Sequence, residues 1–511
     1  MRIPSTRTSP DTILCWPIFQ GNYPQDCLVN TIFGAEDAPD QDHPSHGQVP
    51  TRNIGRCASS LLYREDNIPL LVERFIALVH IKNPLLDIAA LRRNAKMVAE
   101  NGPSWDGVSC LVLLACALGS LAQPLKVEWP QQHDLSIDEP SLQSTSHSRD
   151  DLETAGSYYI LARKRIGLLS NGIVRSQCYF WSGVYLMYTI NPVEAWQNFL
   201  QSSTTQHAYL KGRQSHSKDG AQRSQDRQLE QRLYWSCFKS ECELRVELQL
   251  PESSIASIRY PDMFPSPPDP ASPVTAEVNF SEQDFNIDSP MSQVSSVSNS
   301  QMQQQSWYYY LTEIALRRIA NRVLNAFYKN ELSLNMPLAS MINHANNFEA
   351  ESLQWHAGLP DVLQFDPDHL ENPPTEELPY YIWARFLEMR HWIYLPFIFY
   401  AVHHGPEDPY LDEIQPMVNK GFKHVFACIE GLALRHRHHG IWFGLRGSTA
   451  AAFILVATVK CGHINVPSNW RDAIRSHIAE LRYWENESPD IKEAKRILEE
   501  MLEELPSELI C

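Results

Sequence analysis

The sequence predicts an all-α fold: a large multi-helix domain with one low-complexity disordered insert and an irregular N-terminal arm. Three observations lead to this prediction. Apolar residues recur at three- and four-residue spacing over most of the chain, whereas few segments alternate with period two. Proline (35 residues) outnumbers glycine (21), which is typical of Pro-rich loops between helices. No fixed-period repeat of the solenoid kind is present.

Composition divides the chain into four parts. Residues 1–60 are rich in Pro, Asp, Ser and Thr and are expected to form a mostly irregular arm that docks one apolar segment, 13–23. Residues 61–265 and 307–505 carry the helical patterns and form the first and second parts of the helical domain. Between them, residues 266–306 are rich in Pro, Ser and Gln and cannot bury enough apolar surface to offset their ordering entropy.

The helical segments follow one another with short breaks. Pro192 suits the first turn of its helix, and the polar stretch 139–153 is expected to be a loop. Glu241 and Arg245 are expected to pair on the outer face of theirs. The predicted helices cover residues 67–87, 87–102, 105–122, 155–170, 175–190, 193–211, 228–248, 307–329, 338–356, 376–403, 411–435, 442–460, 468–483 and 490–505.

The stretch "WDGVSCLVLLACALGSLA" (105–122) is predicted to be a helix buried nearly all round. Its apolar run is too short for a membrane span, which needs roughly 20 apolar residues. The other apolar runs are also short, and the polar N-terminus lacks the apolar core of a signal peptide. We therefore expect a soluble, intracellular protein with no membrane contact.

The cysteine spacing and the net charge further limit the functions that the chain could have. Eleven cysteines lie at irregular spacings without a C-x2-C pair, which favours free thiols that act as small core residues in a reducing compartment. The net charge of −17 opposes sequence-independent attraction to phosphate backbones. If the protein acts on DNA, a basic module outside this chain or a partner is expected to make the contact.

Three stretches are candidates for function. "RHRHHG" (435–440) contains His436, His438 and His439, but their spacing does not converge on one helical face, so a solvated helix end is favoured over a metal site. "LARKR" (161–165) is either the polar face of a helix, or a nuclear localisation signal or phosphate-binding patch, and the polar face is favoured.

The third stretch is the aromatic segment 377–400, which is interpreted as a packed core helix, with a ligand cavity as the alternative. Arg385, Glu388 and Arg390 lie among its aromatics and either satisfy one another or contact a polar ligand. The familiar catalytic motifs are absent: there is no G-x-S-x-G, phosphate loop, dinucleotide fingerprint or H-E-x-x-H. No catalytic, metal-binding or cofactor-binding residue is assigned, no cofactor is expected, and an enzyme is disfavoured.

Several stretches, in order, resemble the regulatory region of fungal zinc-cluster transcription factors, the fungal-specific transcription factor domain. The likeness runs from about residue 67 to 490, and in its most recognisable segment Arg232 precedes the aromatic pair Tyr234 and Trp235. The stretches that carry it are "LVERFIALVHIKNPLLD", "WDGVSCLVLLACALGSLA", "ARKRIGLLS", "QCYFWSGVYLMYTINPVEAWQNF", "LEQRLYWSCFKSECELRVELQLPESSI", "RHHGIWFGLRGSTAAAFILVA" and "LRYWENESPDI".

Family members carry an N-terminal module in which six cysteines hold two zinc ions, and this module binds DNA. Here Cys15, Cys27 and Cys57 are too few and wrongly spaced, so no zinc-binding or DNA-contacting residue is carried over. Two explanations stay open: this is a truncated form of a family member, or it is a natural regulator that lacks its own DNA-binding module.

The resemblance implies a nuclear transcription regulator that acts through intramolecular masking, homodimerisation or a small-molecule inducer. Its expected partners are the transcription machinery or a DNA-binding protein, and no direct DNA contact by this chain is expected. Two alternatives remain: a helical partner-binding protein with no link to DNA, and an enzyme with a helical pocket for a small apolar substrate.

Overall fold

The all-α prediction is confirmed. The computed structural model describes residues 8–34, 63–125, 149–213, 222–248, 299–328 and 336–505 except 371 and 433, together with a few positions between 250 and 266. Within these residues the regular structure consists of α-helices and short 3-10 turns, with no strand. Every α-helix contributes side chains to one continuous cluster of buried apolar residues, so the helices share a single core.

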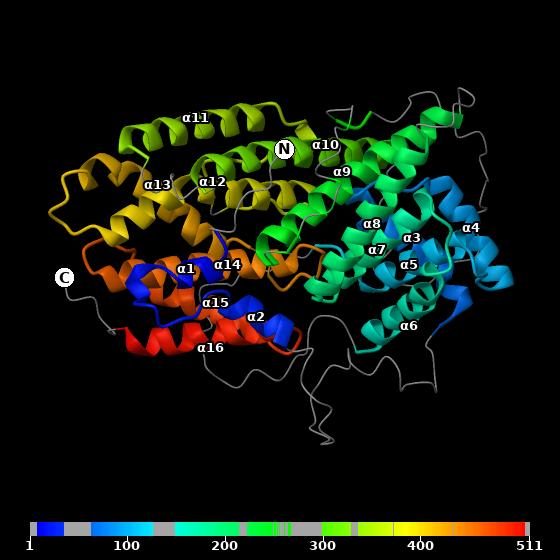
Figure 1. Cartoon of the computed structure of the whole chain (residues 1–511), viewed down its shortest axis with the longest axis horizontal. Coiled ribbons are helices and arrows are strands. Elements are labelled where there is room, and N and C mark those ends of the chain that lie inside the picture. The colour runs from blue at the N-terminus through cyan, green and yellow to red at the C-terminus, as the bar shows by residue number, and fades with distance from the viewer. Residues whose placement is uncertain are drawn as a thin grey trace, which may run out of the picture.

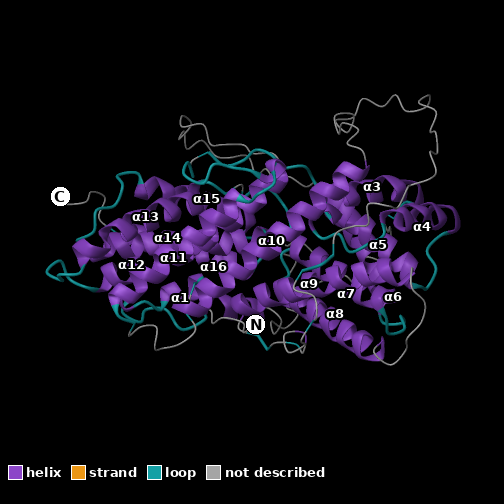
Figure 2. Cartoon of the chain, turned by 90° about the horizontal axis from the view of Figure 1, so that it is seen from above, coloured by secondary structure: helices purple, strands orange, loops and turns teal. Residues whose placement is uncertain are grey.

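The helices form an elongated body with two ends (Figures 1 and 2). One end gathers α3 (Ile68–Leu78), α4 (Ile88–Asn101), α5 (Gly107–Leu121), α6 (Arg149–Ile166), α7 (Ile173–Tyr188) and α8 (Pro192–Arg213). The other end holds α11 (Leu338–Ala357), α12 (Glu377–His403), α13 (Leu411–Glu430), α14 (Ile441–Cys461), α15 (Trp470–Trp484) and α16 (Pro489–Glu504). Between the two ends run α9 (Gln222–Leu248) and α10 (Asn299–Phe327), which join them.

Helix α5 is the buried element that the sequence predicts. The carboxylate of Asp106 caps its first turn by accepting a hydrogen bond from the Ser109 amide at 2.7 Å. Leu113 and Leu114 are fully buried. A Cβ atom at Gly119 would lie 2.1 Å from the backbone oxygen of Leu71, so only glycine lets α3 pack this closely against α5.

The N-terminal arm is more regular than the sequence suggests. Its described part, 8–34, contains α1 (Pro10–Leu14), a 3-10 turn (Pro17–Phe19) and α2 (Cys27–Gly34). The expected docking is confirmed, because α1 packs on α14 and α2 packs on α16. Ile13 and Leu14 are fully buried. The N-terminal segment therefore completes the core formed by the last helices of the chain.

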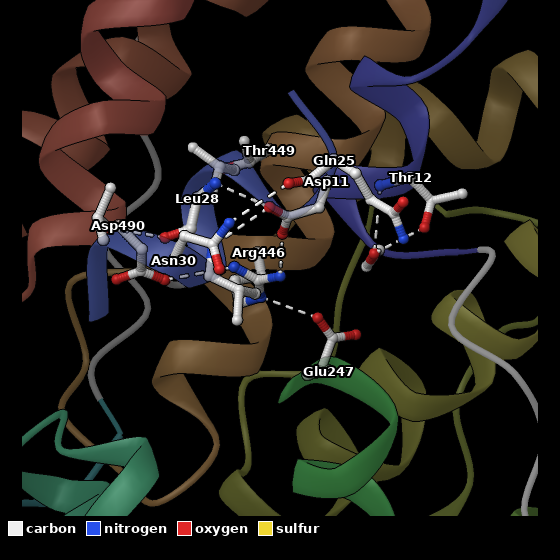
Figure 3. A network of polar contacts seen from close by, with 12 residues as sticks. Asp11, Thr12, Gln25, Leu28, Asn30, Glu247, Arg446, Thr449 and Asp490 are labelled. Carbon is white, nitrogen blue, oxygen red and sulfur yellow. Dashed lines mark hydrogen bonds and ion pairs between the residues drawn. The ribbon is translucent and has the colours of Figure 1, made fainter. Parts of the chain in front are cut away.

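A buried ion-pair network centred on Arg446 fixes this docking (Figure 3). Arg446 lies on α14, and its side chain is 4% exposed. Its guanidinium contacts Asp11 of α1 at 2.7 Å, Glu247 of α9 at 2.8 Å and Asp490 of α16 at 3.3 Å. Asp11 in turn accepts a hydrogen bond from the Leu28 amide of α2 at 2.8 Å. One cation thus connects five helices, and removing it would leave buried carboxylates without their counter-charge.

Several predicted boundaries are wrong, and so is the outer placement of one residue of a predicted ion pair. Residues 149–153, expected in a loop, open α6, where Asp150 and Asp151 suit the positive end of the helix dipole. Residues 299–306, placed in the insert, form the start of α10, where the Ser306 hydroxyl donates a hydrogen bond to the Ile81 carbonyl at 2.6 Å. Most of the predicted insert, 267–298, lies outside the described residues.

Glu241, expected to pair with Arg245 on the outer face of α9, faces the interior instead. Glu241 is 1% exposed and accepts hydrogen bonds from both the backbone amide and the hydroxyl of Ser253, the latter at 2.6 Å. Its carboxylate therefore anchors the chain that follows α9 and does not form a surface pair.

Helix α14 is the one described helix long and apolar enough to cross a membrane by length and composition. However, 83% of its most apolar window is buried inside the protein. It also carries Arg446 in the middle of the ion-pair network. These contacts are those of a core helix in a folded domain.

Replacing Leu113 by Ala is expected to lower the free energy of unfolding by about 2–5 kcal/mol, because it removes buried methyl groups and leaves a cavity in α5. Chemical denaturation of the purified chain measures this loss. The matched control is Leu168→Ala, at a leucine that is 67% exposed, which should change stability by less than about 0.5 kcal/mol. If both variants unfold like wild type, α5 is not a core helix.

Candidate functional site

Two of the candidate stretches, 377–400 and 435–440, meet at a cavity between the helices. The cavity has a volume of about 80 Å³. Its walls come from α10, α12, the last turn of α13, the connection that follows α13 and the first turns of α14. The aromatic segment is therefore both a packed core helix and one wall of a cavity, so the two interpretations of that segment are compatible.

Aromatic rings form much of the wall. Tyr309 of α10, Tyr380 and Tyr381 of α12, and Phe443 of α14 all line the cavity. The Tyr381 ring lies 4.8 Å from the ring of His438. Tyr381 is only 7% exposed, and its buried hydroxyl has no hydrogen-bond partner. A buried hydroxyl without a partner is uncommon in folded proteins, and this one lies on a residue of the cavity wall.

Each charged residue in the cavity wall is neutralised by a neighbour. Arg385 lies 3.3 Å from Glu243 of α9 and 3.3 Å from Glu388, and Glu313 lies 2.7 Å from Lys239. Burial alone would raise the pKa of the Glu243 carboxyl, but Arg317 and Arg385 outweigh it and lower that pKa to about 2. The wall is therefore polar without an excess of either charge.

The prediction that 435–440 is a solvated helix end is wrong. Helix α13 already ends at Glu430, and the described residues that follow form a partly buried connection to α14, in which Arg435 alone is exposed. The Arg437 side chain is fully buried and donates hydrogen bonds to both carboxylate oxygens of Glu487, at 2.9 and 2.6 Å. Its guanidinium also stacks over Trp484 at 4.8 Å. This anchor draws the neighbouring histidines into the protein.

The histidines of this connection serve different neighbours. His438 and His439 line the cavity, and burial, followed by nearby charged or imidazole groups, lowers the pKa of each ring well below its usual value. The Nδ1 atom of His438 accepts a hydrogen bond from the Gly440 amide at 3.0 Å, so the neutral ring carries its proton on Nε2. The cavity thus holds uncharged imidazoles at neutral pH.

A buried ion pair closes the far side of Tyr381. Lys82, from the 3-10 turn after α3, contacts Glu377 at 2.5 Å and lies 4.8 Å from the centre of the Tyr381 ring. The Nε2 atom of His436 lies 3.9 Å from the same carboxylate. This group links the first end of the molecule to the cavity wall.

The remaining candidate residues have structural partners. Arg390 pairs with Glu349 of α11 at 3.0 Å, so it does not join Arg385 and Glu388 at the cavity. In "LARKR", Arg163 and Lys164 are exposed, as a polar helix face predicts. Arg165 is instead 5% exposed and donates hydrogen bonds to the carbonyls of Pro103, Ser104 and Leu161.

The cysteines and possible metal ligands follow a similar pattern. Among the residues that the structure describes, no group of three or more His, Cys, Asp or Glu side chains could hold a metal ion. Cys110, Cys116 and Cys178 are buried and free, as expected for core residues, and burial raises the pKa of the Cys116 thiol. Cys57 lies outside the described residues.

Sequence reasoning missed the contributions of α9 and α10 to the site. Lys239 and Glu243 stand four residues apart on α9, a spacing that resembles an ordinary surface pair. In the structure both point inward, to Glu313 and Arg317 of α10. No local feature of the sequence distinguishes them from exposed charges.

A scan against protein-family models finds no match, and searches of curated proteins and of solved structures find none either. The function is therefore inferred from the cavity, its surroundings and the resemblance of the quoted stretches.

The Glu377–Lys82 pair predicts a loss of stability in acid. Burial would raise the pKa of Glu377, but Lys82 and His436 outweigh it and lower that pKa from 4.5 to about 2. Because the folded state holds this carboxyl ionised, its contribution is complete above pH 4.5 and is lost as pH falls toward 2. The free energy of unfolding, measured by urea denaturation, should fall over this range, with roughly 3 kcal/mol as the upper bound from Glu377.

The variant Glu377→Gln should be less stable at pH 7 and should lose less stability in acid than wild type. Glu503→Gln, at an exposed position on α16, is the control and should follow the wild-type curve. A Glu377→Gln variant whose acid dependence equals that of wild type would show that this carboxyl is not held ionised by its neighbours.

Proposed function

We propose that this chain is the regulatory region of a transcription regulator of the fungal zinc-cluster type, which acts in the nucleus and controls activity without reading DNA itself. The observation that carries the proposal is that the stretches resembling this family lie in one folded unit. They fall on α3, α5 to α9, α14 and α15, and these helices share one core.

The central position of α9 supports this proposal. The segment with the strongest resemblance, 229–255, contains most of this helix. Its Glu243 and Glu247 contact Arg385 on α12 and Arg446 on α14. Both contacts are to the second end, while α9 packs on α8 of the first end, so this one helix touches both ends of the molecule, as regulation by masking or by an inducer requires.

The cavity favours binding over catalysis. Its charged groups are held in ion pairs, and Arg317 and Arg385 make Glu243 a very weak base. With a net charge of −17, the chain is expected to reach promoters through a DNA-binding module or partner and to contact the transcription machinery from there.

Fusion of the chain to an unrelated DNA-binding module should change transcription from a reporter that carries the matching site. The expected change is several-fold relative to the DNA-binding module alone. Leu113→Asp, which places a charge in the centre of α5, is the control and should abolish the effect because it unfolds the domain.

Protein level and nuclear location are measured for both fusions. A wild-type fusion that is present in the nucleus in equal amount and leaves the reporter unchanged would contradict the proposed function. If the chain then co-purified with a protein unrelated to DNA, the partner-binding alternative would be favoured.

A further inference from the structure

We propose that the cavity between α10, α12 and α14 binds a small, neutral, single-ring aromatic compound with one hydroxyl group, of the phenol class. This inference deepens the proposed function, on which its regulatory meaning rests, by naming the chemical class of the inducer. It is drawn from the size of the cavity, its balance of charge, its unpartnered hydroxyl and its glycine-lined face.

The volume limits the ligand to one ring. A cavity of about 80 Å³ has room for only a few water molecules. A single aromatic ring with one hydroxyl group has about seven non-hydrogen atoms and is the largest aromatic ligand that we assign to this space. The aromatic side chains of Tyr309, Tyr380 and Phe443 in the wall provide faces and edges for such a ring.

The charges of the wall exclude an ionic ligand. Arg385 is neutralised by Glu243 and Glu388, while Glu313 is neutralised by Lys239. A carboxylate or ammonium group brought into the cavity would lose its water and find no free counter-charge, which is costly. A neutral ligand avoids this cost.

Two groups provide hydrogen bonds to a single hydroxyl. Tyr381 lines the cavity, and its hydroxyl is enclosed by protein without a partner, so a small shift of the side chain would let it donate to or accept from the ligand. His438 presents a neutral ring next to Tyr381, with Nδ1 already occupied by the Gly440 amide. Its Nε2–H is left as a second donor, so the ligand hydroxyl can be held from two sides.

Three glycines at the start of α14 line the cavity beside Phe443. Gly440, Gly444 and Gly447 follow one another at helical spacing and line the cavity. A Cβ atom at Gly447 would meet no atom within 4 Å, so the space beside this residue is open. Glycine inside a helix is less stable than alanine by about 0.5–1 kcal/mol. At Gly447 its small size leaves room for a ligand, whereas a Cβ atom at Gly444 would lie 3.3 Å from Leu434 and one at Gly440 would lie 2.9 Å from His438.

Binding is tested on the full chain with phenol as the probe. Cyclohexanol, similar in size but not aromatic, and benzoate, aromatic but charged, are the comparison compounds. Calorimetry or ligand-observed NMR should give saturable phenol binding with a dissociation constant on the order of a millimolar or tighter. Cyclohexanol and benzoate should bind at least about tenfold more weakly, a difference of one hydrogen bond or one ring contact.

Three variants locate the site. Gly447→Leu should abolish phenol binding by filling the open space, whereas the matched control Gly447→Ala should keep it. Tyr381→Phe should weaken binding about tenfold without lowering the melting temperature, because the lost hydroxyl has no partner in the free protein. Thermal melting of each variant separates a loss of binding from a loss of folding.

The proposal is overturned if phenol shows no saturable binding to the wild-type chain. It is also overturned if folded Gly447→Leu and Tyr381→Phe bind phenol like wild type, or if benzoate and cyclohexanol bind as well as phenol. The reporter fusion is measured with and without phenol, so a reporter that stays unchanged in both conditions while phenol binding is intact would remove only the regulatory role. If the reporter responds but phenol does not bind, only the proposed ligand class is wrong and the proposed function stands.

Discussion

Arg446 is the charge on which the arrangement of the second end depends. It lies in α14, otherwise one of the most apolar helices of the chain, and a guanidinium buried this deeply is tolerated only where carboxylates surround it. Asp11, Glu247 and Asp490 meet this requirement from three other helices. The neutralisation of Arg446 therefore fixes where the N-terminal arm, α9 and α16 lie. The apolar contacts around Arg446 form within that arrangement.

Helix α9 extends the same constraint to the cavity. Lys239, Glu243 and Glu247 stand at four-residue intervals on one side of the helix. Lys239 pairs with a residue of α10, Glu243 with residues of α10 and α12, and Glu247 with Arg446 of α14. This charged stripe runs beside the apolar residues by which α9 packs into the core, such as Leu233, Cys237 and Leu244. Because Glu243 contacts Arg385 at the cavity wall and Glu247 contacts Arg446, the cavity wall and the network that holds the N-terminal arm are both connected to α9.

Local sequence predicts the helices well because their periodicity is a local property. The apolar run of α5 and the segments that become α7, α12 and α14 are recognised without knowledge of the fold. The charged stripe of α9 is not, since its partners lie 74 to 199 residues away and its spacing is that of a solvated face. The histidines at 435–440 were misplaced for the same reason: Arg437 carries them inward through Glu487, a contact 50 residues away. The cavity was predicted only as an alternative for 377–400, because its other walls come from distant helices.

Native-state hydrogen exchange of Arg446→Met compared with wild type tests most directly whether one buried cation unites these helices. Loss of Arg446 leaves Asp11 and Asp490 without their counter-charge, at a cost of about 3–5 kcal/mol. The amides of α1, α2 and α16, far apart in the sequence, should then lose protection together and by a similar free energy. If only amides of α14 near residue 446 lose protection while those of the arm and α16 keep theirs, the network does not hold the structure together.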